Sequence, residues 1–287
     1  MNVTTLSSFK KRRIIFFLLF FPSVLIFTSE GFAQGNLIII PRRVVFEGPK
    51  RTEALSLANT GADTAKYLIS VIHYRMLDNG AFELITQPDS GQYFADKNFR
   101  FFPRSVVLAP NEAQTVKLQT INTSGLNPGE YRSHLYFRSV PNVKPPGEQP
   151  ADTNSKEISV KLVPIFGIAI PVIIRVGPPV STVAVERAAL EIDGQGARQL
   201  KTTFSRTGNV SVYGDIQIDH VSPQGKTTRV SLVKGFAIYT PNKQRHAVFP
   251  LVDHQNFSYH TGKLRILFTT TSGTRTVKIA ETELELH

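Results

Sequence analysis

The longest apolar pattern in this chain covers residues 158–176. Every second residue from Ile158 to Ile174 is apolar, whereas the residues between them are mixed and include Lys161 and Arg175. A period of two predicts a β-strand, and this strand would be about three times the usual length. A single small domain seldom covers such a strand from end to end. We therefore expect part of it to bind another molecule.

The rest of the chain repeats shorter patterns of the same kind. Valine, isoleucine, threonine and phenylalanine recur in short runs with turn signals between them, and no run keeps a helical period. Repeated short strands of this kind predict an all-β protein built from antiparallel sandwiches. The clearest runs are residues 36–48, 53–61, 66–76, 114–122 and 131–140.

Two segments divide the chain. Residues 141–157 are rich in proline and polar residues and predict a mobile loop before the long strand. Gly177 and the two prolines after it end that strand and predict a stiff hinge. Each half has the size of one immunoglobulin-like sandwich. The predicted domains are residues 34–177 and 178–287.

The first 33 residues have the pattern of a secretion signal. Residues 10–13 are all Lys or Arg, residues 14–27 are almost wholly apolar, and Gly31 and Ala33 are small. This order predicts cleavage after Ala33 and export. The alternative is an uncleaved membrane anchor, for which the apolar core is short. After cleavage we expect a soluble protein with no membrane insertion.

Composition narrows the possible functions. The chain has no cysteine, which excludes thiol catalysis and cysteine-ligated metal. Removal of the signal leaves 29 basic and 21 acidic residues, a net charge of +8. That charge would suit an anionic partner, but no basic run is interleaved with aromatic residues. Nucleic-acid binding is therefore not predicted.

Catalytic motifs are missing from the sequence. The seven histidines are scattered, and no pair has the spacing of a metal site. There is no GxSxG or SxxK motif, and the glycine-containing stretches do not open a helix. We expect a protein that is not an enzyme and that has no cofactor and no metal.

Four segments in order resemble a known family, the periplasmic chaperones of chaperone–usher pilus assembly. The resemblance covers most of the chain after the signal and is clearer in the first half. The long loop and the long strand follow these segments, as they do in the family. The segments are 40–48 (IPRRVVFEG), 55–61 (LSLANTG), 102–112 (FPRSVVLAPNE) and 131–138 (YRSHLYFR).

The resemblance implies a fold and a mechanism. It implies two immunoglobulin-like β-sandwich domains in a boomerang arrangement, located in the periplasm. Such a chaperone lends alternate apolar residues of its long edge strand to a pilus or fimbrial subunit that lacks its last strand. The implied partners are those subunits and an outer-membrane usher, with self-association as a further state of the unloaded protein.

The resemblance also implies roles for individual residues. The donor strand would use Ile158, Val160, Leu162 and Phe166; the alternative is that all four pack in the core of their own domain. Arg43 would bind the terminal carboxylate of the subunit, because its planar guanidinium can donate two parallel hydrogen bonds to a carboxylate. The alternative is a solvated strand arginine.

Two departures from the family concern this site. The family usually adds a cleft lysine, but residues 165–170 contain none, which leaves Lys161 or Arg175 as replacements. The family also tends to have an acid just before the strand at residues 135–137, where this chain has Arg132. These two departures favour a divergent branch of the family. A second hypothesis, from a different functional class, is an exported structural or adhesive β-sandwich protein. A carbohydrate-binding domain is disfavoured because the chain has no tryptophan.

Overall fold

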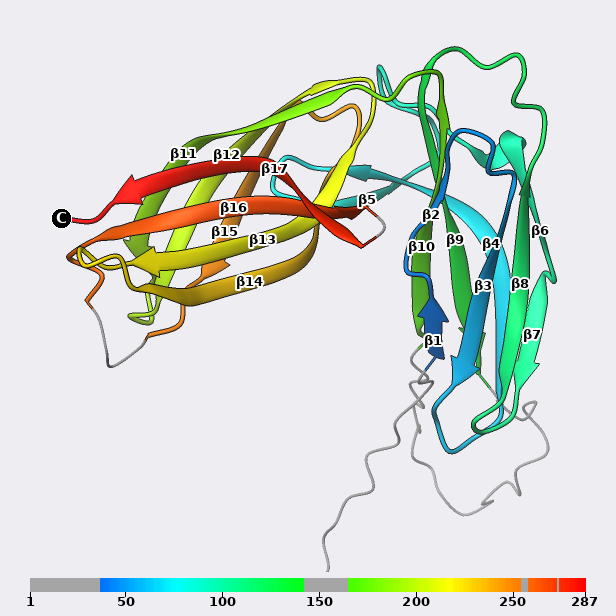
Figure 1. Cartoon of the computed structure of the whole chain (residues 1–287). Coiled ribbons are helices and arrows are strands. Elements are labelled where there is room, and N and C mark those ends of the chain that lie inside the picture. The colour runs from blue at the N-terminus through cyan, green and yellow to red at the C-terminus, as the bar shows by residue number, and fades with distance from the viewer. Residues whose placement is uncertain (1–36, 142–164, 254–257, 273) are drawn as a thin grey trace, which may run out of the picture.

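The protein consists of two β-sandwiches that meet at one end (Figure 1). The computed structural model describes residues 37–141, 165–253, 258–272 and 274–287. Strands dominate these residues, with a single short 3-10 helix at Asp96–Asn98 among the described elements. The predicted all-β class with two sandwich domains is confirmed. The predicted secretion signal, most of the predicted loop and the first half of the long strand lie outside the described residues.

The first domain packs two sheets face to face. One sheet has the order β1–β3–β8–β6, and the other has the order β2–β10–β9–β4–β5 with β7 on β4. The strands of the first sheet are β1 Leu37–Ile40, β3 Thr52–Asn59, β8 Ala113–Thr120 and β6 Phe99–Phe102. Those of the second are β2 Val44–Phe46, β10 Gly167–Val176, β9 Gly129–Val140, β4 Ala65–Met76, β5 Phe82–Ile85 and β7 Ser105–Leu108.

The second domain is built in the same way. Its sheets have the orders β11–β12–β15 and β14–β13–β16–β17. Phenylalanines from both sheets meet in its core, with ring centroids of Phe204 and Phe236 4.9 Å apart. The strands are β11 Ser181–Ile192, β12 Arg198–Gly208, β15 Gln244–Pro250, β14 Thr227–Ile238, β13 Val212–Val221, β16 Lys263–Ser272 and β17 Arg275–Glu285.

The second half of the long apolar pattern forms β10. Ile170, Val172 and Ile174 are buried in the core of the first domain. The alternating residues Ile173 and Arg175 point the other way, because side chains on a strand alternate between its two faces. Ile173 packs with Tyr239 of the second domain, and Arg175 bonds to that domain. This strand therefore serves both the domain core and the contact between domains.

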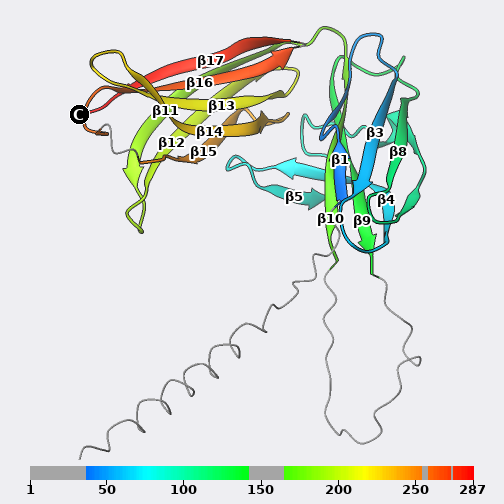
Figure 2. The ribbon, with the colours of Figure 1, turned by 60° about the horizontal axis from the view of Figure 1, so that its bottom comes forward.

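The β4–β5 hairpin adds a second bridge between the domains (Figure 2). The side-chain amide of Asn242 donates to the Met76 carbonyl at 2.9 Å and to the Asp78 carboxylate at 3.0 Å. The backbone N–H of His246 donates to the Asp78 carbonyl at 2.6 Å. The hairpin tip is thus fixed to the start of β15 and to the turn before it.

Candidate functional site

Arg43 reaches from the first domain to the second. It lies just before β2, and its guanidinium donates to the Tyr239 hydroxyl and the Ser211 hydroxyl, both at 3.3 Å. The same group lies 4.6 Å from the centroid of the Tyr213 ring. Arg42, its neighbour in sequence, is exposed. Of the two arginines, Arg43 is the one placed between the domains.

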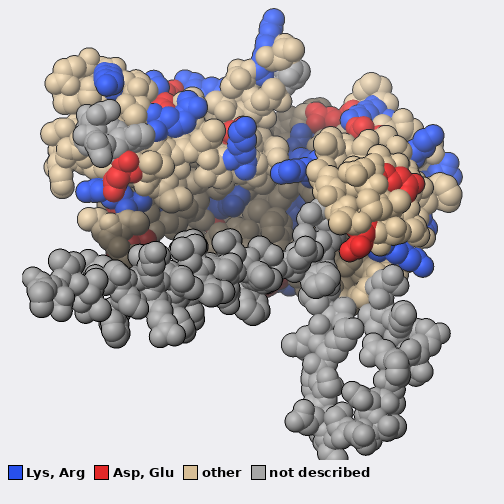
Figure 3. All heavy atoms as spheres, turned by 90° about the horizontal axis from the view of Figure 1, so that it is seen from below, with Lys and Arg blue, Asp and Glu red and all other residues tan. Residues whose placement is uncertain are grey.

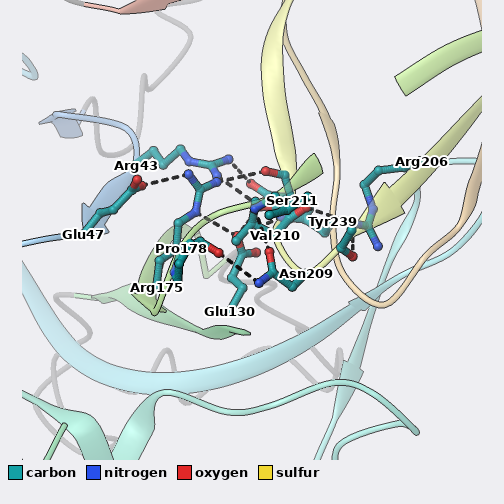
Figure 4. A network of polar contacts seen from close by, with 12 residues as sticks. Arg43, Glu47, Glu130, Arg175, Pro178, Arg206, Asn209, Val210, Ser211 and Tyr239 are labelled. Atoms are coloured by element: carbon teal, nitrogen blue, oxygen red, sulfur yellow. Dashed lines mark hydrogen bonds and ion pairs between the residues drawn. The ribbon is translucent and has the colours of Figure 1, made fainter. Parts of the chain in front are cut away.

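A buried carboxylate joins the domains beside Arg43 (Figure 4). The Glu130 side chain is 0% exposed and accepts from Arg175 Nε at 3.2 Å. It also accepts from the backbone N–H and the hydroxyl of Ser211, at 2.9 and 2.7 Å. Arg175 in turn donates to Glu47 at 3.0 Å and to the Ser211 carbonyl at 2.9 Å. Of these charge-assisted bonds, the three that involve Ser211 join the two domains.

Sequence reasoning missed Glu130. The resemblance directs attention to Arg132, where an acid is expected, but the acid stands two residues earlier on the same face of β9. Strand register explains the pairing, because Glu130 lies directly opposite Arg175. Arg175 was one of two candidates to replace the cleft lysine, and its donors are engaged by Glu47, Glu130 and Ser211. Lys161, the other candidate, lies outside the described residues.

Arg132 is buried at the same contact between domains. It is 2% exposed, and its guanidinium lies 4.0 Å from the centroid of the Tyr239 ring. Its Nη2 donates to the Tyr74 carbonyl at 3.4 Å, whereas Nε and Nη1 have no partner among the described residues. Burial lowers the pKa of Arg132 to about 10, so the group still carries its charge at neutral pH.

We call this contact region the interdomain junction. It is defined by Arg43, Glu130, Arg132 and Arg175 of the first domain and Ser211 and Tyr239 of the second. Seen from below, the molecule is hollowed between its two domains, and Lys and Arg side chains lie around that hollow (Figure 3). The site is therefore positively charged and formed by both domains.

His134 lies next to the interdomain junction on β9. It is 4% exposed, and its ring packs edge-on against Tyr74, with centroids 5.1 Å apart. Burial, together with the charge of Arg132 and the nearby His73, lowers the pKa of His134 to about 3. The imidazole is therefore neutral in the folded protein.

We expect the neutral His134 to make the protein sensitive to acid. Between its unfolded pKa of 6.5 and its folded pKa of about 3, only the unfolded chain binds the proton. Stability should then fall as the pH falls through this window, by about 1.4 kcal/mol per pH unit from this residue. Urea unfolding at pH 6.0 and pH 4.5 measures the effect. The wild type should lose about 2 kcal/mol more than His134→Leu, and equal losses would contradict the assignment.

The predicted donor residues fall at the start of β10 and before it. Phe166 is 51% exposed, and its backbone bonds to Ser139 of β9 in both directions. From Gly167 to Pro171 the strand pairs with β9, whereas β2 pairs with it only from Val172 onward. Among the described residues this part of β10 has one open edge. The other predicted donors, Ile158, Val160 and Leu162, lie outside the described residues.

The described residues contain no group of His, Asp and Glu side chains that could hold a metal ion. No helix among these residues has the length and apolar character of a membrane span.

Comparisons with known proteins gave structural matches only. No family model and no curated protein matches the chain. The class 5 fimbriae chaperone CfaA is 16% identical over 88% of this chain and 99% of its own, with a TM-score of 0.38. The YadV chaperone is 12% identical over 87% of this chain and 99% of its own, with a TM-score of 0.42. The Escherichia coli chaperone DraB is 16% identical over 88% of this chain and 97% of its own, with a TM-score of 0.41.

The solved structures that this chain resembles are fimbrial chaperones.

Proposed function

We propose that this protein is a periplasmic chaperone for pilus or fimbrial subunits and is not an enzyme. After removal of residues 1–33, the domains at 34–177 and 178–287 would act together. The chaperone would bind a subunit by donor-strand complementation and deliver it to an outer-membrane usher. The observation that carries the proposal is the open edge of β10 from Gly167 to Pro171.

An open strand edge supplies one part of the binding energy. A strand of the bound subunit, the client, can pair with β10 through main-chain hydrogen bonds. Alternate side chains of the chaperone strand then enter the groove of the client. An exposed apolar edge is an aggregation hazard unless a partner covers it. Ile165 and Phe166, which are 48% and 51% exposed, lie where that edge begins.

The apolar side chains of the donor strand supply the larger part of the binding energy. Ile158, Val160, Leu162 and Phe166 follow the same alternation as the buried residues of β10. Burying a large aliphatic or aromatic side chain contributes about 1.5–3 kcal/mol. Four such residues would outweigh the one charge-assisted contact of Arg43, worth about 1.5–3 kcal/mol. On these magnitudes the strand provides affinity and Arg43 sets the register.

Aspartate at a donor position should abolish binding without unfolding the chaperone. In Val160→Asp the charge would have to enter the apolar groove of the client, which is strongly unfavourable. Co-purification of subunits with the tagged protein from periplasm, together with the melting temperature, measures both effects. Ser159→Asp is the matched control, because residue 159 belongs to the opposite face and should retain capture.

The outcome separates two roles for this segment. Loss of capture with unchanged melting supports the donor role. Loss of the folded state in Val160→Asp would place the residue in the core of its own domain, as expected for Ile170→Asp, whose side chain is 4% exposed. Location of the protein outside the cell would favour the alternative of a surface adhesin or fibre component.

A further inference from the structure

A cavity of about 510 Å³ lies between the two domains, next to the interdomain junction. The first domain lines it with Gly91, Tyr93 and residues 128–130. The second domain lines it with residues 206–209 and with residues of the turn at 240–243. Sites for small molecules have volumes of about 300–1,000 Å³ and often lie between domains. The cavity therefore has the size and the location of a small-molecule site.

Arg206 places a buried cation in the wall of this cavity. The residue is 4% exposed, and it lines the cavity from the second domain. Its Nη2 has no partner among the described residues, whereas Nε and Nη1 donate at 2.8–3.4 Å to the backbone carbonyls of Thr207, Gly208, Val210 and Asn242. All of these acceptors are neutral. An anion would provide Nη2 with a charge-assisted bond, which is shorter and stronger.

The other charges of the wall also favour an anion. Lys243 is exposed and has no acidic partner among the described residues. Glu130 is the only acid that lines the cavity, and its charge is opposed by Arg175 and by two donors of Ser211. Its Oε1 has no partner among the described residues, but the side chain is 0% exposed. Because the carboxylate offers no surface to a ligand, the accessible charge at the cavity is positive.

Apolar rings form the remaining part of the wall. Tyr93 is 48% exposed, and its ring packs against that of Tyr131, with centroids 5.2 Å apart. Pro128 lines the cavity from the first domain and Pro241 lines it from the second. Aromatic and proline rings provide contact area for a planar or apolar body, which an inorganic ion lacks.

We propose that this cavity binds a small organic anion, with a planar or apolar body that carries a phosphate or carboxylate group. The body packs against Tyr93 and the two prolines, and the anionic group is held by Lys243 and by Arg206 Nη2. The site is separate from the proposed client site, because neither Arg43 nor any described residue of β10 lines it. Since the ligand contacts both domains, its binding stabilises the contact between them.

The test titrates phenyl phosphate into residues 34–287, with benzylammonium as a control of similar ring size and opposite charge. Gly91, Gly129 and Gly208 line the cavity, so their amide resonances in ¹H–¹⁵N NMR spectra report on it directly. Phenyl phosphate should shift all three with a dissociation constant of about 1 mM, and benzylammonium should not. Shifts that spare these glycines would place the binding elsewhere and overturn the inference. Equal affinity for inorganic phosphate would overturn the role of the organic body.

Two variants at exposed positions assign the roles of the wall residues without threatening the fold. Lys243→Glu reverses the charge at the cavity and should weaken binding of phenyl phosphate about tenfold. Tyr93→Ala should weaken it about fivefold and leave the affinity for inorganic phosphate unchanged. Wild-type affinity in Lys243→Glu would contradict the proposed anion site.

Lys226→Glu is the matched control for the charge reversal. Lys226 is exposed in the turn between β13 and β14 and does not line the cavity, so this variant should bind phenyl phosphate as the wild type does. An equal loss in Lys226→Glu and Lys243→Glu would mean that the basic surface attracts anions in general, and would overturn the inference.

Discussion

Replacing Arg43 by alanine is expected to abolish stable capture of the client subunit. The substitution removes the guanidinium that reaches Ser211 and Tyr239 of the second domain, and with it a charge-assisted contact to the client carboxylate worth about 1.5–3 kcal/mol. Affinity should fall roughly 10- to 150-fold. The amount of subunit that co-purifies from periplasm, and its resistance to proteolysis there, measure the loss.

The neighbouring arginine provides the matched control. Arg42 is exposed and carries the same charge, so Arg42→Ala should capture the client as well as the wild type. An equal loss in both variants would mean that general positive charge attracts the client. Unchanged subunit yield in Arg43→Ala would remove the anchoring role altogether.

Replacing Glu130 by alanine is expected to uncouple the two domains. Its buried carboxylate accepts from Arg175 and from two groups of Ser211. Removing one partner of a buried ion pair costs about 3–5 kcal/mol. Because Arg175 keeps its bond to Glu47, we expect the loss to lie at the lower end of that range. Denaturant unfolding, followed by tyrosine fluorescence and by circular dichroism, measures the free energy of unfolding.

Glu47→Ala is the control for this prediction. Glu47 also pairs with Arg175, but its side chain is 40% exposed, and an exposed pair contributes about 0–1 kcal/mol. We expect the Glu130 variant to unfold in two separate transitions and the Glu47 variant to behave as the wild type. Equal stability of the two variants would contradict the role assigned to the buried carboxylate.

The sequence predicted the sandwiches because strand periodicity is local. The alternation that ends at Ile174 assigns one face of β10 to the core, and Ile170, Val172 and Ile174 do lie there. The length of the pattern was less informative. Within the described residues the strand begins at Gly167, and Phe166 before it is exposed. A pattern of alternating residues shows which face is apolar but does not show what covers that face.

The interdomain junction was harder to predict because its partners are distant in sequence. Glu130 and Ser211 are 81 residues apart, and Arg43 and Tyr239 are 196 apart. Their contacts depend on strand register and on how the domains meet. One local signal was present in β9, where Glu130, Arg132 and His134 alternate with residues of the opposite face. Three ionisable side chains on one face of a buried strand indicate a polar contact with another domain.

On the proposed function, the segment leading into β10 enters the bound subunit. The most direct measurement replaces Phe166 by the photo-crosslinking residue p-benzoylphenylalanine, a change of similar shape at an exposed position. Illumination of loaded chaperone should join residue 166 to a fibre subunit, at residues lining the groove of its incomplete sandwich. Crosslinks confined to the chaperone itself, with the subunit present and bound, would show that this segment does not enter the subunit.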